Sequence, residues 1–372
     1  MHRLLYDHQP RIRWTLCMRK TVLRPSIAVP LMLNIARWYF SRVSGRGGFP
    51  LVCGVFLTNR CNCTCSMCSI WRDRKKADLS LETVKTLVDA LTPGLCYLSF
   101  SGGEPLLVNG VMEMIAYTAQ RVPYVHLVSS GLLIDDDRAG ALQKAGLTEL
   151  SLSLDGEREW HTAVRGTPNS FDAVLSAIDS MRRCAPRVEI VVNTVFFPDR
   201  PDQAEKAVAI TRSLGVKHKI QPVNTHFSFA DSVSTPQAVS FSESDAAAVT
   251  AAIGRIRRER HVVNTPAYLA AIPDYVAGKL KCPMIRPKCL LPHYFAEVSA
   301  YGKLSPCMMA TGWEGTVPID ENLRSALRSP GYSFAKHALE SCRLCDRSMY
   351  VCYWEPMMSF PLSNFLKYSF KK

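Results

Sequence analysis

The sequence predicts an α/β fold, a partial (βα)6 parallel barrel followed by a small C-terminal cysteine-rich domain. Between residues 51 and 222, six short apolar runs alternate with stretches of helical periodicity. Apolar strands that alternate with helices are typical of βαβ units and of a parallel sheet. After residue 282, prolines, glycines and cysteines interrupt the chain. With 372 residues and 47 % hydrophobic residues, the chain is long and apolar enough for a sizeable core.

Each expected strand is a short run followed by a turn signal or a helix. In chain order the strands are LVCGVFLT, LCYLSFSG, YVHLVSSG, TELSLSLDG, VEIVVNTVF and VKHKIQPV. The helices between them include LETVKTLVDAL, VMEMIAYTAQ and SFDAVLSAIDSMRR. Because βαβ crossovers are right-handed, the order of elements leaves few possible topologies.

Changes in composition divide the chain into four parts. Residues 1–48 form a basic amphipathic extension, 49–225 the barrel, 226–281 a helical linker, and 282–372 the cysteine-rich domain with a tail. Within the linker we expect helices at SESDAAAVTAAIGRIRRER and at residues 264–281, the second behind a Thr-Pro start.

The net charge of +13 is concentrated near the N-terminus. Residues 1–48 hold nine Lys or Arg residues and one acid, Asp7. In this segment, PSIAVPLMLNIARWYFSRV is predicted to form an amphipathic helix, and the tail SFPLSNFLKYSFKK mixes aromatic residues with lysines. Such segments suit an anionic membrane surface, an acidic partner or nucleic acid. The alternatives are a solvated basic extension and ends that pack on the barrel.

Fourteen cysteines fit either disulfides or metal-bound thiolates. The first apolar stretch, residues 27–40, follows many charges, contains Arg37 and is too short to span a bilayer. It is therefore no convincing secretory signal. We expect a reducing, cytoplasmic location, with peripheral contact at the inner face of the membrane as one option.

Three cysteines in one loop are the most specific signal in the chain. Cys61, Cys65 and Cys68 follow the first strand with the spacing C-x3-C-x2-C. Three thiolates on one loop can bind three irons of a [4Fe–4S] cluster and leave the fourth iron open. Zinc is the alternative, but a structural zinc site needs four ligands, and Cys63 lies too close in sequence to serve as one. Cys63 is instead expected to be packed or incidental.

This loop and the motifs behind it resemble the radical SAM superfamily, over residues 51–222. The resemblance implies roles for residues at the strand ends. Gly102, Gly103 and Glu104 match the GGE motif that contacts the amino group of S-adenosylmethionine (SAM). Arg165 follows His161 as in relatives whose arginine binds the SAM carboxylate. The remaining expected contacts to SAM or substrate are Ser130, where relatives often have Asn, and Ser153, Asp155 and Asn193.

A second set of cysteines follows residue 281. Cys289-x12-Gly302-x4-Cys307 and Cys342-x2-Cys345 resemble the SPASM and twitch auxiliary domains of radical SAM enzymes. This resemblance implies one auxiliary [4Fe–4S] cluster, with a four-cysteine zinc site as the alternative. Cys282 and Cys352 are spare, and Cys352 could replace one ligand. Between the first pair, FAEVSAYGKLSPC predicts a β-hairpin that turns at Tyr301-Gly302.

The family implies that an external reductant, such as flavodoxin or ferredoxin, drives SAM cleavage to a 5′-deoxyadenosyl radical that takes hydrogen from a substrate. Three substrate classes stay open: a peptide or protein, a lipid at the membrane surface, and a small molecule such as an aminoglycoside or nucleoside. The sequence identifies no catalytic acid or base. A non-catalytic metal-binding or RNA-binding protein is a fourth reading, but no recognised motif supports nucleic acid as a partner.

Overall fold

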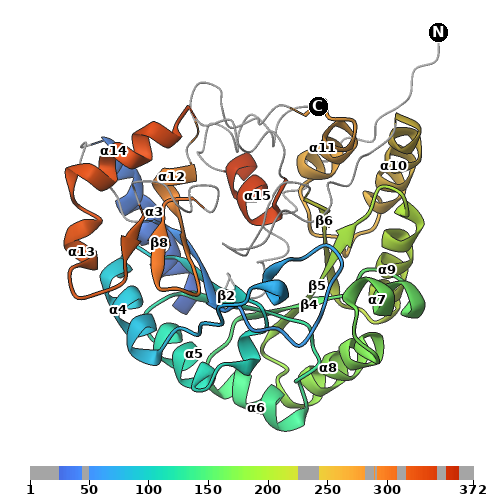
Figure 1. The fold of residues 1–372 in the computed structure, drawn as a ribbon, viewed down its shortest axis with the longest axis horizontal. Helices are drawn as coiled ribbons and strands as arrows, with labels where there is room; N and C mark the ends of the chain where they lie inside the picture. The colour runs from blue at the N-terminus through green and yellow to red at the C-terminus, as the bar shows by residue number, and fades with distance from the viewer. Residues whose placement is uncertain are drawn as a thin grey trace.

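The computed structural model describes residues 25–43, 50–224, 243–280, 289, 291–307, 316–341 and 349–359. Its sheet has nine strands in the order β6-β5-β4-β3-β2-β1-β7-β8-β9. The six predicted strands are β1 (Val52–Thr58), β2 (Tyr97–Gly102), β3 (Tyr124–Ser129), β4 (Glu149–Ser153), β5 (Glu189–Phe196) and β6 (Lys217–Pro222). They pair in parallel and in chain order, which confirms the partial (βα)6 barrel (Figure 1).

Helices cover the outer face of the sheet (Figure 1). They are α4 (Leu81–Leu91), α5 (Val111–Ala119), α6 (Asp136–Lys144), α7 (Arg158–Arg165), α8 (Ser170–Cys184) and α9 (Pro201–Ser213), with short 3-10 turns η1 (Ile70–Arg72) and η2 (Pro105–Leu107). Side chains that point outward from the strands, such as Val55, Leu98 and Leu127, are fully buried under these helices. Because side chains alternate along a strand, the neighbouring residues face the barrel interior.

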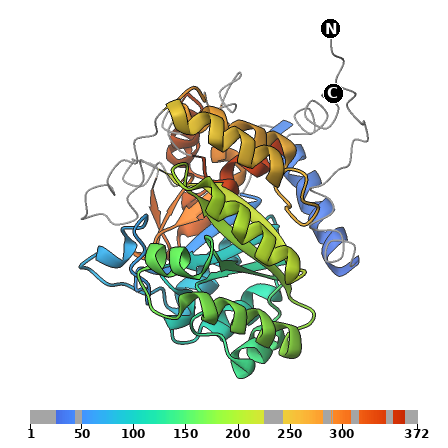
Figure 2. The ribbon, with the colours of Figure 1, turned by 90° about the vertical axis from the view of Figure 1, so that its right-hand side faces the viewer.

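The linker helices are confirmed as α10 (Glu243–Ile256) and α11 (Pro266–Val276). Thr265 caps α11 by accepting a hydrogen bond from the Tyr268 amide at 3.2 Å, and Pro266 opens the first turn. Figure 2 shows these two helices stacked beyond α9, at the β6 edge of the barrel.

The predicted hairpin is confirmed as β7 (Phe295–Val298) and antiparallel β8 (Lys303–Ser305), followed by β9 (Val317–Pro318). Gly302 has φ +72° in the turn, a conformation that favours glycine. β7, which follows α12 (Leu291–Tyr294), also pairs in parallel with β1. The barrel sheet therefore runs on into the C-terminal region without a break.

Helix α15 (Val351–Ser359) bridges the two sides that the partial barrel leaves apart (Figure 1). On the β6 side, the Gln221 side chain accepts a hydrogen bond from the Val351 amide at 3.1 Å. On the β7 side, the Tyr353 ring packs edge-on against Phe295 at 4.8 Å between centroids. The remaining C-terminal helices, α13 (Leu323–Ala326) and α14 (Pro330–Leu339), pack outside β7 to β9.

The predicted N-terminal helix is α3 (Pro25–Val43). It docks at the N-terminal end of the barrel, where Asn34 donates to the Leu95 carbonyl at 3.1 Å and Trp38 donates to the His293 carbonyl at 2.9 Å. Four large apolar side chains of α3 are exposed, Val29, Met32, Leu33 and Phe40, together with Arg37. Among the described helices, none combines the length and apolar character that a membrane crossing needs.

Candidate functional site

The three motif cysteines lie in the loop between β1 and η1, at the C-terminal end of the barrel. Cys63 belongs to the same group, although the sequence suggested only a packed or incidental residue. Its amide donates to the Cys61 Sγ at 3.4 Å, and the neighbouring Cys61 thiol raises the pKa of Cys63. Burial raises the pKa of Cys68 to about 11. Metal binding would therefore displace a proton from the Cys68 thiol.

Asn59 anchors the start of this loop from a buried position. Its amide nitrogen donates to Asp73 Oδ2 at 3.0 Å and to the Lys75 carbonyl at 2.6 Å, and its Oδ1 accepts from the Ala77 amide at 2.8 Å. Tyr301, in the β7–β8 turn, contacts the same Asn59 amide through its hydroxyl at 3.0 Å. The C-terminal hairpin therefore supports the cysteine loop directly.

Gly102 and Gly103 bring the end of β2 into backbone contact with the cysteine loop. The Gly103 amide donates to the Thr58 carbonyl at 2.7 Å, and the Glu104 amide donates to the Arg60 carbonyl at 2.8 Å. A Cβ on Gly103 would lie 1.9 Å from the Arg60 carbonyl oxygen, and one on Gly102 would lie 2.3 Å from that of Thr58. Only glycine fits at either position.

The Glu104 carboxylate ties the end of β2 to the end of β3. It is 1 % exposed and accepts hydrogen bonds from the Ser129 hydroxyl at 3.0 Å, the Ser130 amide at 2.8 Å and the Ser130 hydroxyl at 2.7 Å. Burial raises its pKa, against the lowering effect of these donors and of the Leu106 amide. Glu104 therefore orients the turn and Ser130, while its direct contact to SAM stays a prediction.

Asp155 and Arg165 form a buried ion pair beside the cysteine loop. Arg165 Nε donates to Asp155 Oδ2 at 2.6 Å, and Arg165 Nη1 lies 3.9 Å from Cys65 Sγ. Asp155 Oδ1 accepts from the Val195 amide at 2.9 Å. Burial lowers the pKa of His161 to about 4, so its neutral ring accepts a hydrogen bond from the Asp155 amide at 3.1 Å.

The end of α7 is bound to the cysteine loop through its backbone. The Arg165 carbonyl accepts from the Thr64 amide at 3.1 Å, and the Val164 carbonyl accepts from the Ser66 amide at 2.9 Å. Gly166 ends the helix at φ +61°, and a Cβ there would lie 2.3 Å from Thr64 Oγ1. The guanidinium and the thiols are thus held in one rigid unit, which suits recognition of a carboxylate next to a metal.

Ser153 and Asn193 are paired neighbours on β4 and β5 and point into the barrel. Asn193 Oδ1 is buried and has no hydrogen-bond partner among the described residues. Leaving such an atom unpaired costs about 1–3 kcal/mol, so it marks a place for a ligand donor. The convergent thiols, the backbone contacts at the glycines, the arginine and this orphan amide fit a [4Fe–4S] cluster with SAM.

Deeper in the barrel than the strand ends that carry these residues, a network of polar side chains fills the interior. His126 hydrogen-bonds with the Ser99 hydroxyl and the Ser151 hydroxyl, each at 2.8 Å. Glu149 accepts from Lys219 at 2.8 Å. Burial alone would raise the pKa of Glu149, but Lys219 holds it at about 2. Burial lowers the pKa of His126 to about 4, so the ring is neutral. The sequence analysis missed this network, whose signal was polar residues at alternate strand positions.

Glu297 of β7 is a second residue that the sequence analysis missed. Its side chain lies over Gly54, where a Cβ would come within 2.6 Å of Glu297 Oε2. The Tyr353 hydroxyl donates to the same oxygen at 3.4 Å. Burial raises the pKa of Glu297 to about 8, so the group is protonated at neutral pH. A buried carboxyl that titrates near pH 8 can exchange a proton with a substrate.

The predicted auxiliary ligands are only partly among the described residues. Cys289 and Cys307 are both buried, and the Cys289 amide donates to the Glu340 carbonyl at 2.9 Å. Cys342, Cys345 and Cys282 lie outside the described residues, so the auxiliary ligand set stays a prediction. Cys352 is exposed on α15.

The fold and the cysteine site define a class of enzyme. Residues 55–209 match the Radical SAM superfamily, and the chain is a radical SAM enzyme whose cofactors are SAM and a [4Fe–4S] cluster. It resembles PqqA peptide cyclase of Granulibacter bethesdensis, at 25 % identity over 306 residues and 78 % of each chain. Fe-coproporphyrin III synthase of Methanosarcina barkeri is 35 % identical over 125 residues, 33 % of this chain and 31 % of that protein.

Two solved structures share the fold. SuiB of Streptococcus suis bound to the precursor peptide SuiA superposes with a TM-score of 0.59 at 11 % identity, covering 82 % of this chain and 70 % of that one. The enzyme anSMEcpe with bound AdoMet superposes with a TM-score of 0.57 at 15 % identity, covering 86 % of this chain and 97 % of that one. Both similarities extend well beyond residues 55–209.

Proposed function

We propose that this radical SAM enzyme modifies a peptide or protein. The observation that carries the proposal is the extent of the similarity. The match to the PqqA peptide cyclase covers 306 residues, whereas the match to the Fe-coproporphyrin III synthase covers 125. The first match is about twice as long as the family segment 55–209, so it must extend beyond that segment, whereas the second is shorter than the segment itself. Similarity that extends beyond the cofactor-binding segment supports a shared substrate class rather than a shared cofactor alone.

The chain's own residues have distinct tasks in this proposal. Cys61, Cys65 and Cys68 hold the cluster, and Arg165 and Asn193 hold SAM. The bound cluster and SAM together supply a 5′-deoxyadenosyl radical that takes a hydrogen atom from carbon. Because such a radical attacks whatever lies near it, the protein must orient the substrate and exclude water.

The substrate is proposed to bind in the barrel interior below α15. There, Glu297 and Tyr353 present a neutral carboxyl and a hydroxyl, which can hydrogen-bond a peptide amide. The charged pair Glu149–Lys219 is already satisfied within the protein and would form the polar floor. Cys289, Cys307, Cys342 and Cys345 are proposed to hold one auxiliary [4Fe–4S] cluster, with a flavodoxin or ferredoxin as the external reductant.

Peripheral contact with an anionic membrane is proposed for α3. Its exposed Met32 and Phe40 lie on the side away from the barrel, in a segment of strongly positive charge. Flotation with phosphatidylglycerol-containing vesicles tests this contact. A Met32→Ser/Phe40→Ser variant should float at least several-fold less, whereas Phe334→Ser, an equally exposed phenylalanine on α14, should float like the wild type. Equal flotation of all three would refute it.

Hydrogen transfer tests the substrate class. The holoenzyme, with protiated SAM and dithionite, is incubated with fully deuterated peptide, lipid or small-molecule fractions of a bacterial extract. Deuterium in 5′-deoxyadenosine with the peptide fraction supports the proposal. Deuterium with only the lipid fraction would favour a membrane-lipid substrate, the second candidate that α3 suggests. A Cys61/Cys65/Cys68→Ala variant serves as the control and should form no 5′-deoxyadenosine.

A further inference from the structure

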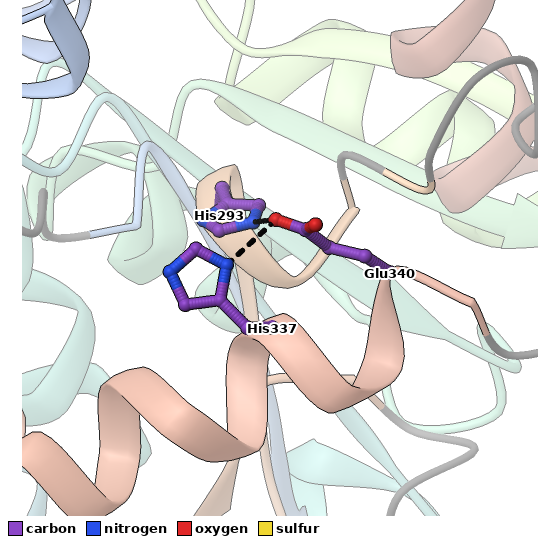
Figure 3. Close-up of side chains that lie close together, drawn as sticks. All are labelled: His293, His337 and Glu340. Carbon is purple, nitrogen blue, oxygen red and sulfur yellow. Dashed lines mark hydrogen bonds and ion pairs between the residues drawn. The ribbon is translucent and has the colours of Figure 1, made fainter.

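A second group of metal-ligand side chains lies outside the radical SAM site, at the opposite end of β7 from the cysteine loop. His293 lies on α12, and His337 and Glu340 lie at the end of α14 (Figure 3). Their ligand atoms all lie within 4.8 Å of one another. Glu340 Oε1 accepts from His293 Nε2 at 2.7 Å and from His337 Nδ1 at 2.9 Å.

We propose that these three side chains bind one Zn²⁺ ion, independently of the iron–sulfur sites. In a tetrahedral zinc site with bonds of about 2.1 Å, neighbouring ligand atoms lie about 3.4 Å apart. The two hydrogen-bonded contacts, at 2.7 Å and 2.9 Å, are shorter than this by about 0.5–0.7 Å, and small side-chain rotations would close the difference. Two imidazoles and one carboxylate are a ligand set that proteins use for zinc.

The local sequence explains why the ligands converge. His337 and Glu340 are three residues apart, so they lie on the same face of the last turn of α14. His293 comes from a different element, because α12 packs beside the end of that helix. Figure 3 shows the two imidazoles approaching the same carboxylate oxygen from different sides.

The three side chains of this proposed zinc site are enclosed on one side and open to solvent on the other. The side chains of His293 and Glu340 are 10 % and 9 % exposed, whereas that of His337 is 62 % exposed. The ion would therefore have two enclosed ligands, one ligand at the surface, and a water in the fourth position. Such a site can load from solvent without unfolding of the protein.

The ion would join two segments that matter to the rest of the molecule. α12 leads directly into β7, whose Glu297 faces the barrel interior. The Glu340 carbonyl accepts the hydrogen bond of the Cys289 amide. Zinc at this point would fix the start of β7 against α14 and stabilise the C-terminal region.

The test uses the full-length holoenzyme, reconstituted anaerobically so that iron occupies its thiolates, and then titrated with ZnCl₂. Zinc and iron per chain are counted after desalting, and the melting temperature is followed against zinc concentration. The wild type should hold one more zinc than His337→Ala and Glu340→Gln at equal iron content. Its melting temperature should rise with zinc, and those of the two variants should not.

The variants separate a metal site from a hydrogen-bonded triad. Glu340→Gln keeps an oxygen that accepts both histidine donors but removes the charge, so it should weaken zinc binding at least about 100-fold. Phe334→Ala, on the exposed side of the same helix, should bind zinc like the wild type. Equal zinc in the wild type and both ligand variants, or no effect of zinc on melting, would overturn the proposal and leave the proposed function unaffected.

Discussion

Replacing Gly103 with alanine should disrupt the contact between the end of β2 and the cysteine loop. The new Cβ would lie 1.9 Å from the Arg60 carbonyl oxygen and 3.1 Å from the Cys61 amide nitrogen. Since packed carbon and oxygen atoms need about 3 Å or more, the two backbones must separate by about 1 Å. Both obstructing atoms belong to backbone, so no side-chain rotation can relieve the clash.

The magnitude follows from the hydrogen bonds that this separation breaks. The Gly103 amide donates to Thr58 at 2.7 Å, and the Glu104 amide donates to Arg60 at 2.8 Å. An extra ångström takes both beyond hydrogen-bonding range. At about 0.5–1.5 kcal/mol each, their loss lowers the free energy of unfolding by about 1–3 kcal/mol. Because Cys61 moves with the loop, 5′-deoxyadenosine formation should fall by about 100-fold or more.

The assay compares Gly103→Ala with Gly140→Ala under anaerobic conditions. Gly140 lies inside α6, and a Cβ there meets nothing within 4 Å. The control should therefore be more stable than the wild type by about 0.5–1 kcal/mol. Urea unfolding, iron per chain and SAM cleavage are measured for all three proteins. If Gly103→Ala keeps wild-type iron, activity and stability, the close backbone approach is not what holds the loop.

Substitutions at three further sites test the ionisable groups in and around the barrel interior. Lys219→Met removes the cation that pairs with the buried Glu149 carboxylate and leaves it only the Tyr124 hydroxyl as a hydrogen-bond donor, so the free energy of unfolding should fall by about 3–5 kcal/mol. Lys219→Met/Glu149→Gln should recover most of this loss, and an equally unstable double variant would contradict the reasoning. The pKa of Glu297 is raised to about 8 in the fold, so folding takes up a proton and stability falls as pH rises from about 4.5 to about 8. Glu297→Gln should flatten this part of the stability profile, measured by melting temperature against pH, and an unchanged profile would refute the assignment. Arg165→Lys keeps the positive charge but loses the Nε hydrogen bond to Asp155. Calorimetry should therefore show that the affinity for SAM falls about tenfold or more, while the iron content stays unchanged. An unaltered affinity would show that Arg165 does not bind SAM.

Local sequence patterns predicted the elements whose residues are close in the chain. The cysteine loop spans eight residues, so its spacing alone indicates the cluster. The alternation of strands and helices predicted the order β1 to β6, because parallel strands with short crossovers have few possible arrangements. The β7–β8 hairpin was also predictable from the sequence, because its two strands are adjacent in the chain and Gly302 marks the turn between them.

Contacts between segments that are distant in the chain could be identified only from the tertiary structure. β7 pairs with β1 about 240 residues away, and nothing in FAEV distinguishes that partner from any other strand. The small residue Gly54 makes room for Glu297, and Glu297 in turn meets Tyr353 of α15. None of these residues lies in a recognisable sequence motif, so the role of each follows only from the residues that surround it in the fold.

The sequence by itself determined the class of enzyme, the cluster loop and the parallel core, because each depends on short-range spacing or on strand order. Only the tertiary structure decided what faces the barrel interior and how the His293–His337–Glu340 group forms. Burial and electrostatics act through space rather than along the chain. A carboxyl such as Glu297 therefore acquires its shifted pKa from the fold that surrounds it.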